Sequence, residues 1–354
     1  MTPPVATQSV TRTLSGRAFS LIELLVVITI IAVVIAITVP ALSGARDLAR
    51  KASTEATVNS LVQAISSYQA DNQRAPGYFS PEEMGNIGNI NRGFSSMQNI
   101  MLDLVGGPID SSGTPNPNAL KVGPTRALEV DVDPALINIG DNAKGYYTPD
   151  ASDYKPAEGT QAIPDHMKLP EVIDAWGSPI LAWVENDVGA VMNDTSEISD
   201  FAQITALQAS TLPPARFYWA QNSAALSATA LGKRQVDQAT DSLLGLNVPD
   251  TERVVHMAAL LGSPNSSVKT NSNFQSILPR VGRGKVIFQS AGSDRVFLAE
   301  KDSGYKALAG EFVFGRNLTP KANINAGQYE RKDGTQGSID IVEGFDDIVT
   351  SAGN

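Results

Sequence analysis

The chain has 354 residues and a formal net charge of −10 at pH 7. An acidic chain without a basic cluster argues against binding of nucleic acid, because such binding requires neutralisation of phosphates. The absence of cysteine excludes disulfides, thiol catalysis and cysteine-zinc sites. The two histidines, His166 and His256, are far apart in sequence, which argues against a histidine-rich metal site or an imidazole general base.

The first long apolar stretch runs from Phe19 to Val39 and contains one charged residue, Glu23. As a helix this stretch extends roughly 31 Å, the thickness of the hydrocarbon core of a bilayer. An acid inside such a span costs about 2–3 kcal/mol near the bilayer centre, so we expect Glu23 to have a function and a partner. The preceding residues 1–18 contain arginines and no acid, which predicts a basic leader.

The string Ala18-Phe19-Ser20-Leu21-Ile22-Glu23, followed by the apolar run, resembles the cleavage and methylation segment of type IV prepilins and type II secretion pseudopilins. The resemblance implies that prepilin peptidase cuts between Ala18 and Phe19 and methylates the new amino group. It makes Glu23 the fifth residue of the mature chain and places Pro40 where many of these proteins have a proline. Ala18 stands where the family usually has glycine, and we still expect cleavage.

The expected partner of Glu23 is the amine of Phe19. Cleavage creates a cation in an apolar medium, which the carboxylate would neutralise in the same subunit or in a neighbouring one. The alternative is a plain signal anchor in which the acid has no role.

Beyond Pro40 the spacing of apolar residues predicts an amphipathic helix over 40–73, with a kink or loosening at the proline. Arg74-Ala75-Pro76 should end it, because the residue before a proline disfavours helix. We expect its apolar stripe to pack on the molecule's own sheet. The stripe consists of Leu48, Ala52, Ala56, Val58, Leu61, Val62, Ile65 and Tyr68.

Residues 74–354 should form the globular head, with two insertions. The first, at about 79–170, is rich in turn-forming residues and predicts short helices at 81–84 and 95–105 and an edge strand at 127–132. The spacing of Asp131, Asp133 and Asp141 does not fit a calcium-binding loop. The second insertion, at about 186–280, is predicted to be mostly helical, with His256 as a packing residue. Its helical stretches are 201–210, 224–231, 241–246 and 251–261.

The remaining runs are β-rich and indicate an antiparallel sheet. A Gly-x-Pro turn predicts a strand over 180–185, with Trp176 packed under the turn. Alternation predicts a hairpin of 285–289 with 295–299. Further strands are expected at 311–314 and 338–342. The fold class is therefore α+β: a long N-terminal helix packed on a small antiparallel sheet, with large loop and helical insertions.

Four segments beyond the membrane-spanning run also resemble type II secretion pseudopilins. Tyr68 to Pro76 and Asp174-Ala175-Trp176-Gly177-Ser178-Pro179 resemble segments of the major pseudopilins. Ser290-Ala291-Gly292-Ser293-Asp294 and Asp346-Asp347-Ile348 resemble elements of their calcium-binding loop, although about fifty positions separate the two. The resemblance implies Ca²⁺ ligands at Ser290, Asp294, Asp346 and Asp347. The alternative is a turn whose acids cap the backbone.

We find no nucleophile elbow, phosphate-binding glycine loop or histidine cluster, so we expect no enzymatic activity. The resemblance implies a filament subunit: a large minor pseudopilin of a type II secretion system, or alternatively a minor pilin of a type IV pilus. The other class of hypothesis is a membrane-anchored binding protein that shares only the leader with these proteins. The implied partners are prepilin peptidase, other pilin or pseudopilin subunits and an inner-membrane assembly platform. The implied location is the bacterial inner membrane, with the head in the periplasm before assembly.

Overall fold

The computed structural model describes residues 20–106, 119–133, 145–150, 154–156, 169–193, 195–206, 213–227, 238–263, 279–302, 329–330, 336–337, 342 and 345–353. The chain divides into two compact units, Met1–Ala49 and Arg50–Asn354. The predicted leader at 1–18 and the predicted strand at 311–314 lie outside the described residues, as does 338–342 apart from Val342.

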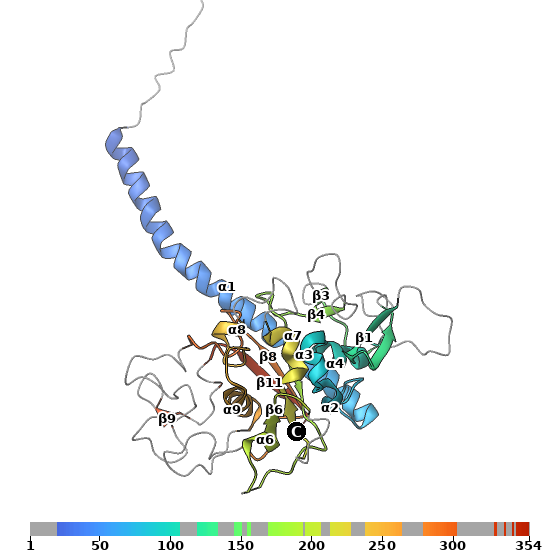
Figure 1. Ribbon diagram of the computed structural model, residues 1–354. Coiled ribbons are helices and arrows are strands. Elements are labelled where there is room, and N and C mark those ends of the chain that lie inside the picture. The colour runs from blue at the N-terminus through green and yellow to red at the C-terminus, as the bar shows by residue number, and fades with distance from the viewer. Residues whose placement is uncertain are drawn as a thin grey trace, which may run out of the picture. The chain divides into compact units, whose positions relative to one another are not determined.

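Helix α1 (Leu21–Asn72) confirms the expected long N-terminal helix, and Figure 1 draws it as one uninterrupted element. Pro40 lies inside it, and the helix continues on both sides of the proline. Two other predicted helices are present, α2 (Pro81–Met84) and α4 (Ser96–Leu104). Each begins with a serine whose side chain accepts a backbone N–H three residues later, an arrangement that favours helix initiation.

The other helices of the head are short except for α9. They are α3 (Ile87–Arg92), α6 (Ile198–Phe201), the 3-10 helix η2 (Trp219–Asn222), α7 (Ser223–Leu226), α8 (Gln238–Asp241) and α9 (Asp250–Leu261). Helix α9 confirms the prediction for 251–261. Helix α3 was not predicted, because its six residues carry little apolar periodicity.

The central sheet has three antiparallel strands in the order β11 (Ile348–Ala352), β8 (Val286–Ser290) and β5 (Leu181–Val184). Strand β5 confirms the predicted strand over 180–185. Smaller two-stranded pairs complete the β structure. They are β1 (Leu120–Thr125) with β2 (Leu128–Val132), β3 (Tyr154–Pro156) with β4 (Pro170–Val172), β6 (Ala202–Gln203) with β7 (Phe217–Tyr218), and β9 (Tyr329–Glu330) with β10 (Gln336–Gly337).

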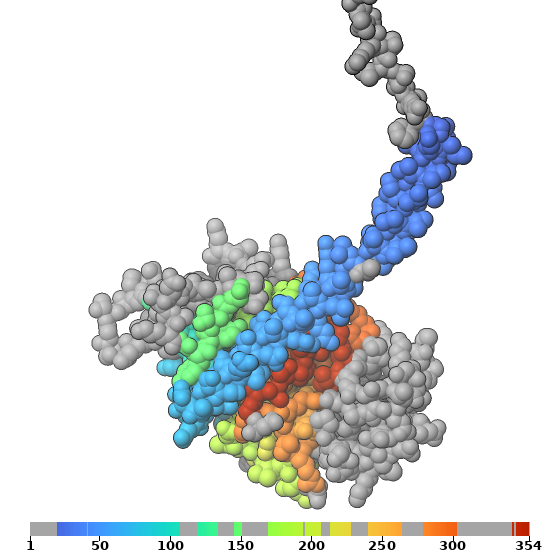
Figure 2. All heavy atoms as spheres, turned by 180° about the vertical axis from the view of Figure 1, so that it is seen from behind, coloured from blue at the N-terminus to red at the C-terminus, as the bar shows by residue number. Residues whose placement is uncertain are grey.

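Both faces of the central sheet are covered, because successive side chains of a strand point to opposite faces. Ala182 and Phe288 belong to one apolar core, together with the buried side of α1. Trp183 and Ile287 belong to a second core, which contains most of α9. Figure 2 shows β11, in red, beside the light blue later part of α1. The expected packing of α1 on the sheet is thus confirmed for residues 50–72.

The buried face of α1 differs from the predicted stripe. Val58, Leu61, Ile65 and Tyr68 are buried as expected. The predicted stripe residues Leu48, Ala52 and Ala56 are exposed, whereas Thr54 and Thr57 are buried. The prediction counted only apolar residues and so omitted the two threonines. Their hydroxyls can be buried because each forms a hydrogen bond with the backbone: Thr54 Oγ1 accepts from Ala175 N at 3.1 Å, and Thr57 Oγ1 donates to Ser53 O at 3.2 Å.

The predicted hairpin partner at 295–299 was wrong. Residues 292–295 and 297–298 form turns, and both Arg295 (φ 66°) and Leu298 (φ 46°) adopt the left-handed region. A strand cannot pass through two such residues, so β8 pairs with β5 and β11 instead.

Two helical predictions in the second insertion were also wrong over their described parts. In 201–210 helix α6 ends at Phe201 and strand β6 follows, while 207–210 lies outside the described residues. In 241–246 helix α8 ends at Asp241, and 242–246 are bridge, turn and bend rather than helix. Trp176, which was expected to pack under the turn, is partly buried.

Candidate functional site

The structure brings three carboxylates together at one end of the central sheet. One oxygen each of Asp294, Asp302 and Asp346 lies within 4.8 Å of the others. Asp294 and Asp302 lie in the turns that follow β8, and Asp346 lies just before β11. The antiparallel pairing of β8 with β11 joins Ser290 to Ile348, which carries the two segments to the same place.

Some oxygens of the cluster are already bound by the protein. Asp346 Oδ2 accepts from the N–H and the hydroxyl of Ser293, at 2.8 and 2.7 Å, and from Asp294 N at 3.2 Å. Asp294 Oδ1 accepts from Val296 N at 2.8 Å. Among the described residues, Asp294 Oδ2 and Asp346 Oδ1 are buried atoms without a hydrogen-bond donor. Lys301 Nζ lies 3.7 Å from Asp294 Oδ2.

The electrostatics of the cluster oppose full ionisation. Burial raises the pKa of Asp302 to about 7, and the neighbouring Asp346 and Asp294 add to the effect. Burial is also the main cause of a raised pKa at Asp294. Carboxylates that crowd one another in this way either hold protons or accept a compensating cation. Hard oxygen donors of this kind are ligands that Ca²⁺ prefers, so the residues fit a divalent cation.

Gly292 allows the close approach of the two segments. Its φ is 67°, and a Cβ at this position would lie 2.5 Å from Asp346 O. Any side chain there would be strained in backbone conformation and would also displace Asp346.

Ser290 and Asp347, which the resemblance implied as ligands, bond elsewhere. Ser290 Oγ donates to Asp174 Oδ2 at 2.7 Å. Asp347 accepts from Gln289 Nε2 at 2.7 Å and from Leu298 N at 3.0 Å, and its burial raises its pKa well above the usual range. Of the four residues implied by the resemblance, Asp294 and Asp346 therefore belong to the carboxylate cluster. Asp302 was missed, because no local motif connects it to the other two.

The N-terminal segment is the second candidate site. Among the described residues, α1 is the helix long and apolar enough to cross a membrane, and its apolar window has no buried residues. From Ser20 to Ala45 the only charge is Glu23. The hydroxyls of Thr29 and Thr38 donate to Leu25 O and Val34 O, at 2.8 and 2.9 Å. Both hydroxyls are thereby satisfied within the helix.

Glu23 participates in the start of α1. Ser20 N donates to Glu23 Oε2 at 2.8 Å, and Glu23 N donates to Ser20 Oγ at 3.2 Å. This reciprocal pair is a capping box, which satisfies two of the free N–H groups at a helix start. Ala18 and Phe19 lie outside the described residues, so the predicted pairing of Glu23 with the amine of Phe19 stays a prediction.

Comparison with known families identifies this segment. Residues 15–39 match the family model of the prokaryotic N-terminal methylation motif. The chain carries a prepilin-type leader. No curated protein and no solved structure matches the chain.

The prepilin-type leader makes the N-terminus type IV pilin-like and implies processing by prepilin peptidase and assembly with other pilin subunits. Together with the apolar half of α1, it fits a membrane-anchored protein. The match covers the predicted cleavage position, Glu23 and the apolar run. It does not extend to the head, where the carboxylate cluster lies.

Proposed function

We propose that this chain is a large minor pseudopilin of a type II secretion system. In this proposal prepilin peptidase removes residues 1–18, and the apolar part of α1 anchors the mature chain in the bacterial inner membrane. The periplasmic head then joins a filament with other pseudopilins at the assembly platform. Its role is structural, without catalysis. The observation that carries the proposal is the methylation motif at 15–39 with one acid inside the apolar run.

The resemblance of short segments of the chain to pseudopilins, 174–179 among them, favours the secretion system over a surface pilus. The segment 174–179 forms a tight turn in which Gly177 has a φ of 87° and donates to Asp174 O at 2.9 Å. The turn leads directly into β5, so the sequence pattern has a clear structural role. A minor pilin of a type IV pilus is the alternative that shares the leader. A membrane-anchored binding protein is the alternative that does not form a filament.

Glu23 would act twice in this scheme. In the chain described here its carboxylate binds Ser20 N and caps α1. Cleavage would create an ammonium group on Phe19, the residue before Ser20. This ammonium group can attract the Glu23 carboxylate of the same subunit or that of a neighbouring subunit. A charge left without a counter-charge in an apolar medium is strongly unfavourable. Assembly should therefore depend on the negative charge at this position.

The test compares Glu23→Ala, Glu23→Gln and Glu23→Asp with the wild-type chain in a cell that assembles the filament. Because cleavage precedes assembly, we expect all variants to begin at Phe19 by mass spectrometry of the intact chain. We expect Ala and Gln variants to be missing from purified filaments and the Asp variant to be partly retained. Glu82→Gln, an exposed acid of α2, serves as the matched control. Normal amounts of the Gln variant in filaments would contradict the role given to the charge.

We also propose that Asp294, Asp302 and Asp346 bind Ca²⁺ and pin the turns after β8 to β11. The support is two buried oxygens that accept no hydrogen bond, Asp346 Oδ1 and Asp294 Oδ2, the second of which has only the lysine ammonium of Lys301 at 3.7 Å. A cation there would compensate the burial of Asp302 and the neighbouring carboxylates, which together raise the pKa of Asp302.

Thermal unfolding of the full chain in detergent tests this second proposal. Ca²⁺ should raise the melting temperature and a chelator should reverse the rise, because a ligand that binds only the folded state stabilises it. Asp302→Asn should abolish the response, whereas Asp131→Asn, at a half-exposed acid of strand β2, should retain it. Equal responses in both variants would exclude the cluster as the binding site.

A further inference from the structure

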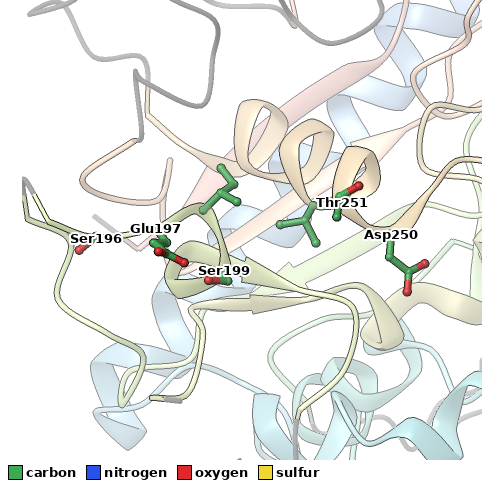
Figure 3. Close-up of a pocket in the computed structure, with 7 residues that line it drawn as sticks. Ser196, Glu197, Ser199, Asp250 and Thr251 are labelled. Atoms are coloured by element: carbon green, nitrogen blue, oxygen red, sulfur yellow. The ribbon is translucent and has the colours of Figure 1, made fainter. Parts of the chain in front are cut away.

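A pocket on the head lies between the start of α6 and the first turn of α9. Its volume is about 530 Å³, within the range of small-ligand sites. Figure 3 shows Glu197 and Ser199 on the α6 side and Thr251 and Asp250 on the α9 side. It is lined by Ser196, Glu197, Ile198, Ser199, Asp250, Thr251 and Val254.

The floor of the pocket is apolar and joins the main core. Ile198 and Val254 are partly buried and pack against the core cluster that contains Phe201 and Val255. The two apolar side chains are therefore fixed in place from below and keep an exposed side toward the pocket. An aliphatic side chain of a ligand would gain burial there without rearrangement of the protein.

The walls are held in position by local bonds. On one side, Glu197 N donates to Asp200 Oδ2 at 2.8 Å, and Asn193 N donates to Ser196 Oγ at 2.9 Å. On the other side, Arg253 anchors the start of α9. Its guanidinium lies 4.5 Å from the ring centroid of Trp219, and its Nε donates to Val248 O at 3.0 Å. A preformed site of this kind loses little entropy when it binds.

The rim is negative. The two segments that line the pocket, 195–206 and 250–254, contain four acids and one base, Arg253. The side chain of Arg253 is 7% exposed and pairs with Asp250, whose own side chain is 67% exposed. The guanidinium of Arg253 lies over the buried ring of Trp219, while the side chains of Asp250 and Glu197 face solvent. Such a rim repels anionic ligands and attracts cations.

We propose that this pocket binds a peptide segment of a partner protein in which an aliphatic residue is flanked by lysine or arginine. The apolar floor takes the aliphatic side chain, and Glu197 and Asp250 face the flanking cations. Ser196, Ser199 and Thr251 also line the pocket and supply hydroxyls that can bond the peptide backbone. The site lies in the head and does not depend on the leader or on filament assembly.

The test measures binding of a dye-labelled peptide of Lys-Leu-Lys repeats to the full chain in zwitterionic detergent, by fluorescence polarisation against a micelle blank. Because surface charge pairs contribute little individually, Glu197→Gln should weaken binding about twofold, and Glu197→Gln with Asp250→Asn about fivefold. Glu82→Gln, the same change on an exposed acid outside the pocket, should leave binding unchanged. Higher salt should weaken binding by the wild-type chain.

The matched peptide has serine in place of leucine and should bind at least about fivefold more weakly, because serine buries too little apolar surface on the pocket floor. Glu197 is exposed, so its variant is expected to fold even if the double variant does not. Equal affinity of the two peptides, or equal affinity of the Glu197→Gln and Glu82→Gln variants, would overturn the proposal. So would self-association of the chain through this pocket in place of peptide binding.

Discussion

At the scale of single residues, Asp174 is the clearest structural acid of the head. It is 3% exposed and accepts from Trp176 N at 2.9 Å, Ser178 N at 2.8 Å and Ser290 Oγ at 2.7 Å. One carboxylate therefore closes the turn before β5 and joins it to the end of β8. The sequence pattern 174–179 predicted the turn, whereas the bond to Ser290 depends on strand pairing.

Asp174→Ala should lower the free energy of unfolding by about 2–4 kcal/mol, because it leaves buried donors without an acceptor. Asp174→Asn keeps an oxygen acceptor and should cost less. Denaturant titration of the full chain measures both. Asp187→Ala, at a side chain that is 64% exposed, is the control and should cost less than about 1 kcal/mol. Equal losses for Asp174→Ala and the control would contradict this account.

The same residue predicts a pH dependence. Burial raises the pKa of Asp174 from 3.8 to about 6, despite the hydrogen bonds that lower it. The folded state then binds more protons than the unfolded chain between these values. The contribution of Asp174 to the free energy of unfolding is therefore full below pH 3.8 and is lost as the pH rises through 6. The free energy of unfolding falls with a slope of at most about 1.4 kcal/mol per pH unit.

Between pH 4 and 7 the wild-type chain should therefore lose more stability than Asp174→Asn, which cannot ionise. Denaturation midpoints at several pH values provide the measurement. Parallel pH profiles for the two proteins would show that Asp174 does not carry this dependence.

At the scale of elements, the sequence predicted those that carry strong local patterns. Helix α9 and strand β5 are examples. His256, which was predicted to be a packing residue of this helix, is fully buried, and its Nδ1 lies 3.0 Å from Leu243 O. Strand β11 was missed, because Ile348–Ala352 lacks a clear apolar alternation and is recognisable only through its partner β8. Local patterns could not supply that pairing, since more than fifty positions separate the two strands.

The outer edge of β5 is covered by side chains, an arrangement that no sequence pattern predicts. Val184 N donates to Gln221 Oε1, and Gln221 Nε2 donates to Val184 O, both at 3.1 Å. Asn222 Nδ2 donates to Ala182 O at 2.8 Å. Two side chains thus take the place of a fourth strand and protect a sheet edge that would otherwise present unpaired groups.

Gln221→Ala should lower the free energy of unfolding by about 2–3 kcal/mol, because both backbone groups of Val184 lose their partner in a buried place. Gln63→Ala, at an exposed position of α1, should have an effect below about 0.5 kcal/mol. Denaturant titration compares the two variants. A loss at Gln221 no larger than that at Gln63 would show that the edge is satisfied in another way.

At the scale of the whole molecule, the two candidate sites differ in how far the sequence reveals them. The processing and anchoring segment is contiguous, so a short motif together with the apolar run predicts it, and the family comparison supports it. The carboxylate cluster comes from separate turns and depends on the pairing of β8 with β11. The resemblance therefore pointed to Asp294 and Asp346 but not to Asp302.

In the proposed function the chain matures at Phe19 and enters a filament. Mass spectrometry of filaments purified from the native cell tests it most directly. We predict that the chain is recovered in the filament fraction with N-methylated Phe19 as its first residue, and that deletion of prepilin peptidase leaves residues 1–18 attached and removes the chain from that fraction. Recovery of the chain only in the membrane fraction, while other subunits form filaments, would contradict the claim.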